Sequence, residues 1–429
     1  MMQPRPAHVV ILTDFARARG GASALAMLQA RLLGQRGVKV TVFAGDESAD
    51  MPPGVNLLSL GGKRLLDQGR AAAAVDGLWN AAARRALSGW IAQHDEPGTI
   101  YHVHGIQQTL SPSVLSPLRP HAARVVLHAH DYFLACPNGA FFDFRAGRAC
   151  ERRAMSAACL GRNCDKRSRA QKLWRLARQS LQDRQTGALL QQGRVVLIHP
   201  AMGQRLWPGR QDLRATAIPN PAAALVDGTD PVSRSEFVYV GDIHAYKGVF
   251  LLAEAARRAG VPLRFLGDGQ DRARLQSAYP EHHYDGWVDR QGLARRLSGA
   301  RALVAPTLGP EPYGLAPVEA LLSGVPVILS DSMLLAQDIR RLGAGATFAA
   351  GDTDDLAERL SLLAGDDDAL RAMAARSAAA GAQLSLPPEA WADRLMALYS
   401  DMLAQGQGNA RQGGSHSPEL AFAGPPLGP

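Results

Sequence analysis

The chain has 429 residues, of which 46% are hydrophobic, and a formal net charge of +8 at pH 7. This length predicts two or three domains, each large enough for its own core. Because no apolar run approaches the roughly eighteen residues that span a bilayer, the sequence excludes a membrane-spanning helix. Residues 1–6 lead into an apolar run without the cleavage pattern of a signal peptide, so we expect a cytoplasmic protein.

A buried-strand pattern at 8–15 opens the chain and is followed by the glycine pair Gly20-Gly21. A helical pattern at 24–34 and a strand pattern at 38–43 come next. A glycine pair between a strand and a helix leaves backbone amides open to an anion, so Gly20 and Gly21 are candidate site residues. A simple tight turn explains the same residues.

Two β-rich runs end in histidines. One ends at Tyr101-His-Val-His104, and the other at His128-Ala-His130, which is followed by Asp131. Histidines at strand ends can reach a ligand, so His104, His130 and Asp131 are candidate site residues. Satisfied structural histidines remain the alternative.

All four cysteines follow this His-Asp pair, in a segment at about 132–185: Cys136, Cys150, Cys159 and Cys164. Four sulfurs equal the ligand number of a structural zinc site, although paired Cys-x2-Cys knuckles are missing. Buried reduced thiols are the second explanation of the cluster, and a cytosolic location disfavours disulfides. Structural zinc, buried thiols and a redox pair all remain open.

The same segment is strongly basic. Residues 145–184 hold twelve Arg and Lys against three acidic residues, an excess larger than the net charge of the chain. Such a segment suits an anionic membrane surface, a lipid-linked pyrophosphate sugar or an acidic glycan. Nucleic acid is an unfavoured partner, because no nucleic-acid-binding motif accompanies the charge. For 169–184 a solvated helix is the alternative.

The C-terminal half alternates strands with helices. A strand pattern at 237–240 and a glycine turn lead to Lys247, directly before a helical pattern at 249–259. This position suits a phosphate contact. Strand and glycine turn recur at 263–269, so the pattern predicts a parallel α/β sheet.

Two carboxylates, Glu311 and Glu319, flank the junction of a Pro/Gly loop and a helical pattern at 315–323. Open parallel sheets bind ligands at such a junction of strand end and helix start. The amides of Gly314 and Leu315 can face a phosphate, while the carboxylates can accept hydrogen bonds from ribose or sugar hydroxyls. A capped surface helix with solvated glutamates is the alternative.

Five motifs follow one another in this half: Gly241 with Lys247-Gly248, Gly267-Asp268-Gly269, Gly286, Glu311 to Glu319, and Gly324-Val-Pro-Val. In this order and spacing they resemble the donor domain of retaining glycosyltransferase family four, over residues 236–350. The resemblance implies an α/β GT-B fold, with two Rossmann-like lobes, a cleft between them, and a C-terminal helix that crosses back to the first lobe. The expected parts are an N-terminal lobe at 1–221, a linker at 222–234, a donor lobe at 235–380, a crossing helix at 381–404 and a disordered tail at 405–429.

The resemblance also implies an activity: retaining, hexosyltransferase-like transfer of a sugar from a nucleoside diphosphate sugar to an acceptor hydroxyl, without a metal cofactor. The acceptor would be a glycan or a lipid-linked molecule in cell-surface polysaccharide or glycolipid assembly, at the inner face of the cytoplasmic membrane. By resemblance, Lys247 neutralises the diphosphate, Glu319 holds the ribose, Glu311 binds the transferred sugar, His130 supports that sugar, and the Gly20 and Gly21 amides approach the leaving phosphate.

One residue departs from the family pattern. Asp242 stands where many members carry arginine, and a carboxylate repels a diphosphate at close range. A noncatalytic glycan- or nucleotide-binding protein on a degenerate GT-B scaffold is therefore an alternative, and a GT-B sugar-nucleotide epimerase is another.

Overall fold

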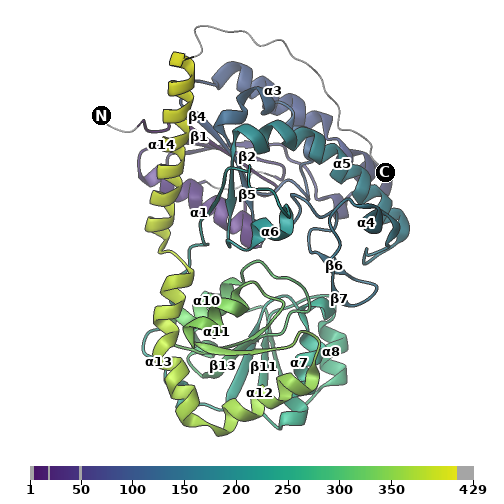
Figure 1. Cartoon of the computed structure of the whole chain (residues 1–429), viewed down its shortest axis with the longest axis vertical. Coiled ribbons are helices and arrows are strands. Elements are labelled where there is room, and N and C mark those ends of the chain that lie inside the picture. The colour runs from purple at the N-terminus through teal and green to yellow at the C-terminus, as the bar shows by residue number, and fades with distance from the viewer. Residues whose placement is uncertain (1–3, 18–19, 48–50, 413–429) are drawn as a thin grey trace.

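The computed structural model describes residues 4–17, 20–47 and 51–412 and shows two α/β lobes, one above the other along the long axis of the molecule (Figure 1). Both lobes are built on parallel sheets whose central strands are buried, largely apolar runs. Such runs are typical of sheets that helices cover on both faces.

The N-terminal lobe has a seven-stranded parallel sheet in the order β3-β2-β1-β4-β5-β8-β9. Its strands are β1 His8–Thr13, β2 Lys39–Ala44, β3 Val55–Ser59, β4 Thr99–Val103, β5 Val125–Ala129, β8 Arg194–Leu197 and β9 Ala215–Ala217. Its helices are α1 Gly21–Gln35, α2 Arg70–Leu78, α3 Ala81–His94, α5 Arg169–Gln192 and α6 Met202–Leu206, with 3-10 turns η1 Leu65–Asp67, η2 Pro112–Leu115 and η3 Arg119–Arg124. The Cys-containing insert adds β6 Phe142–Asp143, β7 Arg148–Ala149 and α4 Ala157–Gly161.

The C-terminal lobe has a six-stranded parallel sheet in the order β12-β11-β10-β13-β14-β15. Its strands are β10 Glu236–Val240, β11 Leu263–Leu266, β12 His283–Gly286, β13 Ala300–Ala305, β14 Val327–Ser330 and β15 Gly345–Phe348. Its helices are α7 Val249–Ala259, α8 Arg272–Ala278, α9 Arg290–Leu297, α10 Leu315–Leu322, α11 Leu335–Leu342, α12 Thr353–Gly365 and α13 Asp367–Leu384, with 3-10 turns η4 Pro231–Ser233 and η5 Ala245–Lys247.

The chain passes between the lobes twice at one place. Pro221 pairs with Leu386, and Ala222 N donates to Leu386 O at 3.1 Å. Beyond this crossing, α14 Pro388–Gln412 runs along the N-terminal lobe (Figure 1), and its Trp391 and Tyr399 are fully buried there. The C-terminal helix therefore returns to the first lobe, as the sequence predicts.

The boundaries at this end differ from the sequence-based ones. The crossing helix is expected at 381–404, but α13 continues to Leu384 and α14 spans Pro388–Gln412. The expected disordered tail at 405–429 thus begins with helical residues, and its remainder at 413–429 lies outside the described residues.

The segment expected as a linker, 222–234, packs along the C-terminal lobe. Leu225 N donates to Ser323 Oγ at 2.9 Å, and Thr229 Oγ1 donates to Ser323 O at 2.6 Å.

Within the described ranges, no helix combines the length and the apolar character that crossing a bilayer requires.

Candidate active site

Lys247 and Glu311 meet in the C-terminal lobe. Lys247 ends η5, which follows β10, and Glu311 lies in the loop that follows β13, the neighbouring strand. Lys247 Nζ donates to Glu311 Oε2 in an ion pair. Burial alone would lower the pKa of Lys247, but attraction to Glu311 and, less strongly, to Asp242 raises it. The lysine therefore stays charged at neutral pH.

Glycine at position 248 makes this pair possible. Gly248 adopts φ 76°, in the left-handed region that glycine tolerates, and a Cβ there would overlap with the carbonyl oxygen of Pro306. The backbone after Lys247 can therefore pack directly against the loop that carries Glu311.

Glu319 lies on α10, the helix that follows the Glu311 loop. Glu319 Oε1 lies 3.4 Å from Arg290 Nη1. Burial raises the pKa of the Glu319 carboxyl, and Arg290 opposes this effect. Leu315 and Ala316 begin α10. Because the backbone amides of a first helical turn have no acceptor within the helix, this end of α10 carries a partial positive charge.

Asp242, the departure from the family pattern, is exposed beside this site. Its backbone carbonyl accepts a hydrogen bond from Tyr239 Oη at 2.7 Å. Its carboxylate is close enough to Lys247 to contribute to the raised pKa of that lysine. Lys247 thus interacts with two carboxylates, Glu311 and Asp242.

In the N-terminal lobe, His104 and His130 are in direct contact. β4 and β5 pair so that Val103 lies opposite Leu127, which brings the histidines that follow these strands onto one side of the sheet. His104 Nδ1 lies 2.8 Å from His130 Nε2, and His104 Nε2 lies 2.6 Å from Gln29 Oε1 of α1. The rings of His104 and His130 stack with centroids 5.0 Å apart.

These contacts define which ring nitrogens carry protons. Burial lowers the pKa of His104 well below its ordinary value and that of His130 to about 3, so both rings are neutral at pH 7. Because an amide oxygen only accepts, His104 Nε2 carries its proton and His104 Nδ1 accepts from His130 Nε2. His130 Nδ1 is then a lone-pair acceptor, and within the described residues this buried atom has no hydrogen-bond partner.

Two more histidines extend this network away from the site. His102 Nε2 lies 3.1 Å from His128 Nδ1. Tyr399 Oη of α14 lies 2.5 Å from His102 Nδ1 and accepts from Gln29 Nε2 at 2.6 Å. Hydrogen bonds therefore connect the crossing helix to His130.

The ligand atoms of His102, His104 and His128 lie within 4.8 Å of one another, as metal ligands would. However, the rings of His102 and His104 stack at an interplanar angle of 20°, and the facing nitrogens of His102 and His128 already form a hydrogen bond. Stacked rings direct their in-plane lone pairs side by side and not toward one point. We therefore interpret the four histidines as a hydrogen-bonded network.

The loop after β5, together with the insert that follows it, approaches the C-terminal lobe. Asp131 remains accessible to solvent, but the protein atoms crowded around it raise the pKa of its carboxyl to about 6. Burial, together with Glu311 of the other lobe, raises the pKa of the neighbouring Tyr132. The insert reaches the C-terminal lobe as well, since Phe144 packs edge-on against Tyr246 with ring centroids 5.6 Å apart.

The cysteines give no support to the zinc hypothesis. All four are buried free thiols, and in the described part of the chain they do not form a group of three sulfurs close enough to hold an ion. Instead, Lys172 Nζ lies 3.4 Å from Cys164 Sγ and 3.6 Å from Cys159 Sγ. Burial raises the pKa of Cys136 to about 11, so this thiol is protonated at neutral pH.

The basic segment at 145–184 is not one exposed surface. Lys172 and Arg178 are buried, and Arg175 Nε lies 2.8 Å from Asp165 Oδ2. Arg162 Nε and Arg152 Nη1 lie 2.6 and 3.5 Å from Asp143 Oδ2. A charge count along the sequence therefore overstates the free positive charge, because tertiary packing uses much of it.

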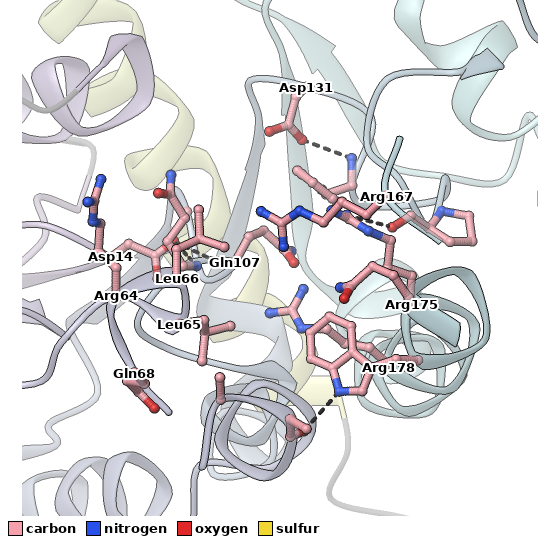
Figure 2. Close-up of a pocket in the computed structure, with 18 of the residues that line it drawn as sticks. Asp14, Arg64, Leu65, Leu66, Gln68, Gln107, Asp131, Arg167, Arg175 and Arg178 are labelled. Carbon is pink, nitrogen blue, oxygen red and sulfur yellow. Dashed lines mark hydrogen bonds between the residues drawn. The ribbon is translucent and has the colours of Figure 1, made fainter. Parts of the chain in front are cut away.

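A cavity of about 1140 Å³ opens beside the Gly20-Gly21 turn (Figure 2). Gly20, Gly21 and Asp131 line it, so the structure brings these three predicted residues together. It also joins Lys247 to Glu311 and His104 to His130. Glu319 interacts with Arg290, and within the described residues it forms neither a hydrogen bond nor an ion pair with Lys247. The sequence analysis missed Gln29, His102, His128 and Tyr399; the alternation of histidines in two adjacent strands was the available signal.

The C-terminal lobe matches a known family. The family described as Glycosyl transferases group 1 matches residues 234–366. A phosphatidyl-myo-inositol mannosyltransferase of Mycobacterium leprae (strain TN) is 32% identical over 126 residues, which are 29% of this chain and 33% of that protein. The chain therefore spans about a third of the length of the curated relative that it matches.

Solved structures match over nearly the whole chain. A sucrose-phosphate synthase from Thermosynechococcus elongatus has a TM-score of 0.69 at 17% identity, covering 93% of this chain and 99% of that one. HepE from Anabaena, solved with UDP, has a TM-score of 0.63 at 13% identity, covering 92% and 100%. WaaG, a glycosyltransferase involved in lipopolysaccharide biosynthesis, has a TM-score of 0.59 at 16% identity, covering 95% and 100%. The chain has the GT-B fold of these glycosyltransferase structures, with a Glycosyl transferases group 1 domain in its C-terminal lobe.

Proposed function

We propose that this protein is a retaining glycosyltransferase that moves a sugar from a nucleoside diphosphate sugar to an acceptor hydroxyl. The observation that carries the proposal is the Lys247–Glu311 ion pair at the strand ends of the lobe that matches the Glycosyl transferases group 1 family. A cation beside a carboxylate offers one contact for a diphosphate and another for sugar hydroxyls. Two structures of one similar protein, HepE, are described as complexes with UDP and with UDP-glucose, which agrees with such a donor.

In this proposal the donor diphosphate replaces Glu311 as the ion-pair partner of Lys247. The Glu311 carboxylate, released from the lysine, accepts hydrogen bonds from hydroxyls of the transferred sugar. The amides at the start of α10 add positive potential near the diphosphate, and Glu319 accepts from the ribose. His130 Nδ1, a buried acceptor without a partner in the described residues, accepts from a further sugar hydroxyl.

Catalysis would then be electrostatic and positional. Lys247 and the helix amides stabilise the charge that develops on the leaving diphosphate. The leaving phosphate oxygen takes the proton of the acceptor hydroxyl on the face from which it departs, so the configuration at the sugar carbon is retained. The enzyme also aligns donor and acceptor. The entropy lost when two substrates are brought together is a large part of the activation barrier, and binding supplies that cost before the reaction.

The acceptor is proposed to be a glycan or a lipid-linked molecule. The curated relative is a phosphatidyl-myo-inositol mannosyltransferase by name, and one similar structure is that of a glycosyltransferase involved in lipopolysaccharide biosynthesis. Both agree with a role in glycolipid or cell-surface polysaccharide assembly, with the protein attached peripherally to the inner face of the cytoplasmic membrane.

Asp242 favours a second candidate, a noncatalytic protein that binds a nucleotide or a glycan. This exposed carboxylate adds negative charge near Lys247, where a diphosphate needs positive charge. Weakened stabilisation of the leaving group would leave binding in place while turnover is lost.

One experiment separates the candidates. The purified full chain is titrated with UDP-, GDP- and ADP-sugars by calorimetry, and donor hydrolysis is measured in the same samples. A glycosyltransferase binds one nucleotide sugar and hydrolyses it slowly, or transfers it when an acceptor is added. Binding without turnover in the presence of candidate acceptors supports the noncatalytic protein. Binding to none of the donors rejects the glycosyltransferase and leaves only a glycan-binding protein.

A further inference from the structure

The cavity beside the Gly20-Gly21 turn is lined by more cations than the proposed donor site needs. Its basic residues come from two stretches of the N-terminal lobe, around η1 and α2 and around the start of α5 (Figure 2): Arg64, Arg70, Lys166, Arg167, Arg175 and Arg178. Only two of the lining residues are acidic, Asp14 and Asp131. Lys247, Glu311 and Glu319 do not line this cavity.

Two of these cations have partners outside the cavity lining, since Arg64 pairs with Asp67 and Arg175 pairs with Asp165. Within the described residues, the two acidic lining residues form no ion pair with the other cations. The Asp14 carboxylate accepts hydrogen bonds from the backbone amides of residues 107–110, at 2.6 to 2.9 Å, and from Thr109 Oγ1 at 3.0 Å. These hydrogen bonds from the loop stabilise the negative charge of Asp14. The Asp131 carboxylate accepts from the backbone amide of Phe133 at 2.8 Å and forms no ion pair within the described residues.

Arg178 is a buried cation without a paired anion in the described residues. Only 7% of its surface is exposed. Its Nε donates to Gly77 O at 2.7 Å, and its Nη2 donates to Ile106 O at 2.8 Å. Burial lowers the pKa of Arg178 to about 10, so the guanidinium remains charged at neutral pH. Attraction to the Asp14 carboxylate opposes the effect of burial only in part. Because a buried cation outside an ion pair is costly, this position favours an anion that arrives with a ligand.

Lys166 and Arg167 lie at the rim near the start of α5, and both side chains are exposed. Neither forms an ion pair in the described part of the chain. Burial of the ammonium lowers the pKa of Lys166, and repulsion from Arg167 and Arg175 adds to this. Asp165, which pairs with Arg175, offsets this repulsion in part. An anion bound beside Lys166 and Arg167 would relieve the repulsion between those two exposed cations.

Two long helices also begin at this cavity. The N-terminal residues of α1, from Gly20 to Ser23, line one side, and Ser168, Ala170 and Gln171 at the start of α5 line another. Each helix start adds partial positive charge to that of the side chains. Leu65, Leu66 and Trp174 supply an apolar wall, which suits a ligand that joins a charged group to an organic chain.

We propose that this cavity binds a phosphate group of the acceptor, either a monoester or a diester. This inference rests on the proposed function, in which Lys247 and the start of α10 bind the donor diphosphate. The family resemblance also implies that the Gly20 and Gly21 amides approach the leaving phosphate at one edge of the cavity, so the acceptor phosphate is assigned to the cations around the start of α5. The cavity adjoins Asp131 and the Gly20-Gly21 turn, so an acceptor anchored by its phosphate would hold its hydroxyl near the proposed transfer site.

The probe is hexyl phosphate, titrated by calorimetry, with hexanol as its neutral counterpart. The test variant is Lys166→Gln/Arg167→Gln, and the matched control is Arg169→Gln/Arg184→Gln, which removes two exposed charges outside the cavity. We expect the test variant to lose at least about tenfold in hexyl phosphate affinity, the value of one charge-assisted hydrogen bond, and the control to change less than about twofold. Thermal unfolding checks that both variants fold.

Vesicles distinguish the two sources of the phosphate. Cosedimentation with phosphatidic acid vesicles that depends on Lys166 and Arg167 identifies a lipid-borne phosphate. Hexyl phosphate binding without such cosedimentation identifies a water-soluble phosphate ester. Equal affinity for hexanol and hexyl phosphate, or equal loss in the test and control variants, overturns the proposal.

A donor-site variant separates this inference from the proposed function. Lys247→Ala is expected to weaken nucleotide-sugar binding and to leave hexyl phosphate binding unchanged. If Lys247→Ala abolishes hexyl phosphate binding, the anion occupies the donor site and the proposal is wrong. If hexyl phosphate binds as expected but none of the nucleotide sugars does, the anion site stands and the proposed glycosyl transfer fails.

Discussion

His104 Nδ1 lies 2.8 Å from His130 Nε2, and this contact determines which nitrogen of His130 is available to a ligand. Gln29 Oε1 fixes the proton of His104 on Nε2, so His104 can only accept at Nδ1. His130 must then donate from Nε2 and present the lone pair of Nδ1. Gln29 in turn donates to Tyr399 of α14, so the crossing helix supports the orientation of a residue proposed to contact the donor sugar.

This assignment predicts different effects for two substitutions of His130. The amide oxygen of asparagine can take the position of Nδ1, whereas the amide of glutamine takes that of Nε2. We expect His130→Gln to lose about tenfold in kcat/KM for the donor, the value of one hydrogen bond, and His130→Asn to keep most of its activity. His283→Asn, an exposed histidine in the C-terminal lobe, is the control. The opposite order of the two His130 variants would show that Nε2 is the contacting atom.

The buried histidines predict a loss of stability at acid pH. Burial lowers the pKa of His130 to about 3 and those of His102, His104 and His128 well below 6.5. Below about pH 6.5 the unfolded chain therefore binds protons that the folded chain does not, and each histidine lowers the unfolding free energy by up to about 1.4 kcal/mol per pH unit. Their stabilising contribution is complete above this range and is lost as the pH falls.

Asp131 has the opposite effect on the pH dependence of stability. Its folded pKa of about 6 lies above its ordinary value of 3.8, so between these values the folded state binds the extra proton and gains stability as the pH falls. We therefore expect Asp131→Asn to raise stability at neutral pH and to steepen the loss below about pH 6. Urea unfolding across this pH range measures both effects. A wild-type midpoint that does not change between about pH 5.5 and 7.5 would contradict the histidine account.

Local patterns in the sequence predict much of this fold, because helix and strand periodicity depends on neighbouring residues. The helical pattern at 249–259 matches α7, Val249–Ala259, and the family resemblance leads to the GT-B fold. The sequence does not predict the Gln29–His104–His130 contacts, since they depend on tertiary packing that brings Gln29 of α1 next to the histidine after β4. Nor does it separate buried Arg178 from exposed Arg169, because both belong to one basic helix and only tertiary packing distinguishes them.

Lys247→Ala is expected to weaken donor binding by roughly 1.5 to 3 kcal/mol, the range for a hydrogen bond to a charged group. The change removes a phosphate contact and leaves Glu311 without its ion-pair partner. The double variant Lys247→Ala/Glu311→Gln should therefore bind donor better than the sum of the two single effects implies. Calorimetry measures the affinities, with Arg371→Gln on α13 as a control that removes the same charge elsewhere. Unchanged affinity in Lys247→Ala would remove Lys247 from the donor site.

Turnover is expected to survive chelation of divalent cations. Lys247 and the start of α10 supply positive charge for the diphosphate. In the sequence Asp352-Thr353-Asp354, Asp352 caps a helix, because Asp352 Oδ1 accepts from the amides of residues 354 and 355, each at 3.0 Å. Donor hydrolysis is measured with EDTA and after addition of magnesium. Activity that disappears with EDTA and returns with magnesium, while the protein stays folded, would contradict a metal-independent mechanism.

Attachment to an anionic membrane is expected through apolar side chains on neighbouring elements of the N-terminal lobe. Leu66 of η1, Val75 of α2 and Leu173 of α5 are 65%, 63% and 57% exposed. Exposed arginines of the basic segment can add about 1 kcal/mol each near an anionic surface, before screening by salt. Cosedimentation with phosphatidylglycerol vesicles should therefore exceed that with phosphatidylcholine vesicles and fall as salt rises. Leu66→Ser/Leu173→Ser should weaken it, whereas Leu362→Ser, a 51% exposed leucine on α12 of the other lobe, should not. Equal binding to both vesicles, or equal loss in the two variants, would show that this face does not contact the membrane, and a water-soluble acceptor would then be preferred.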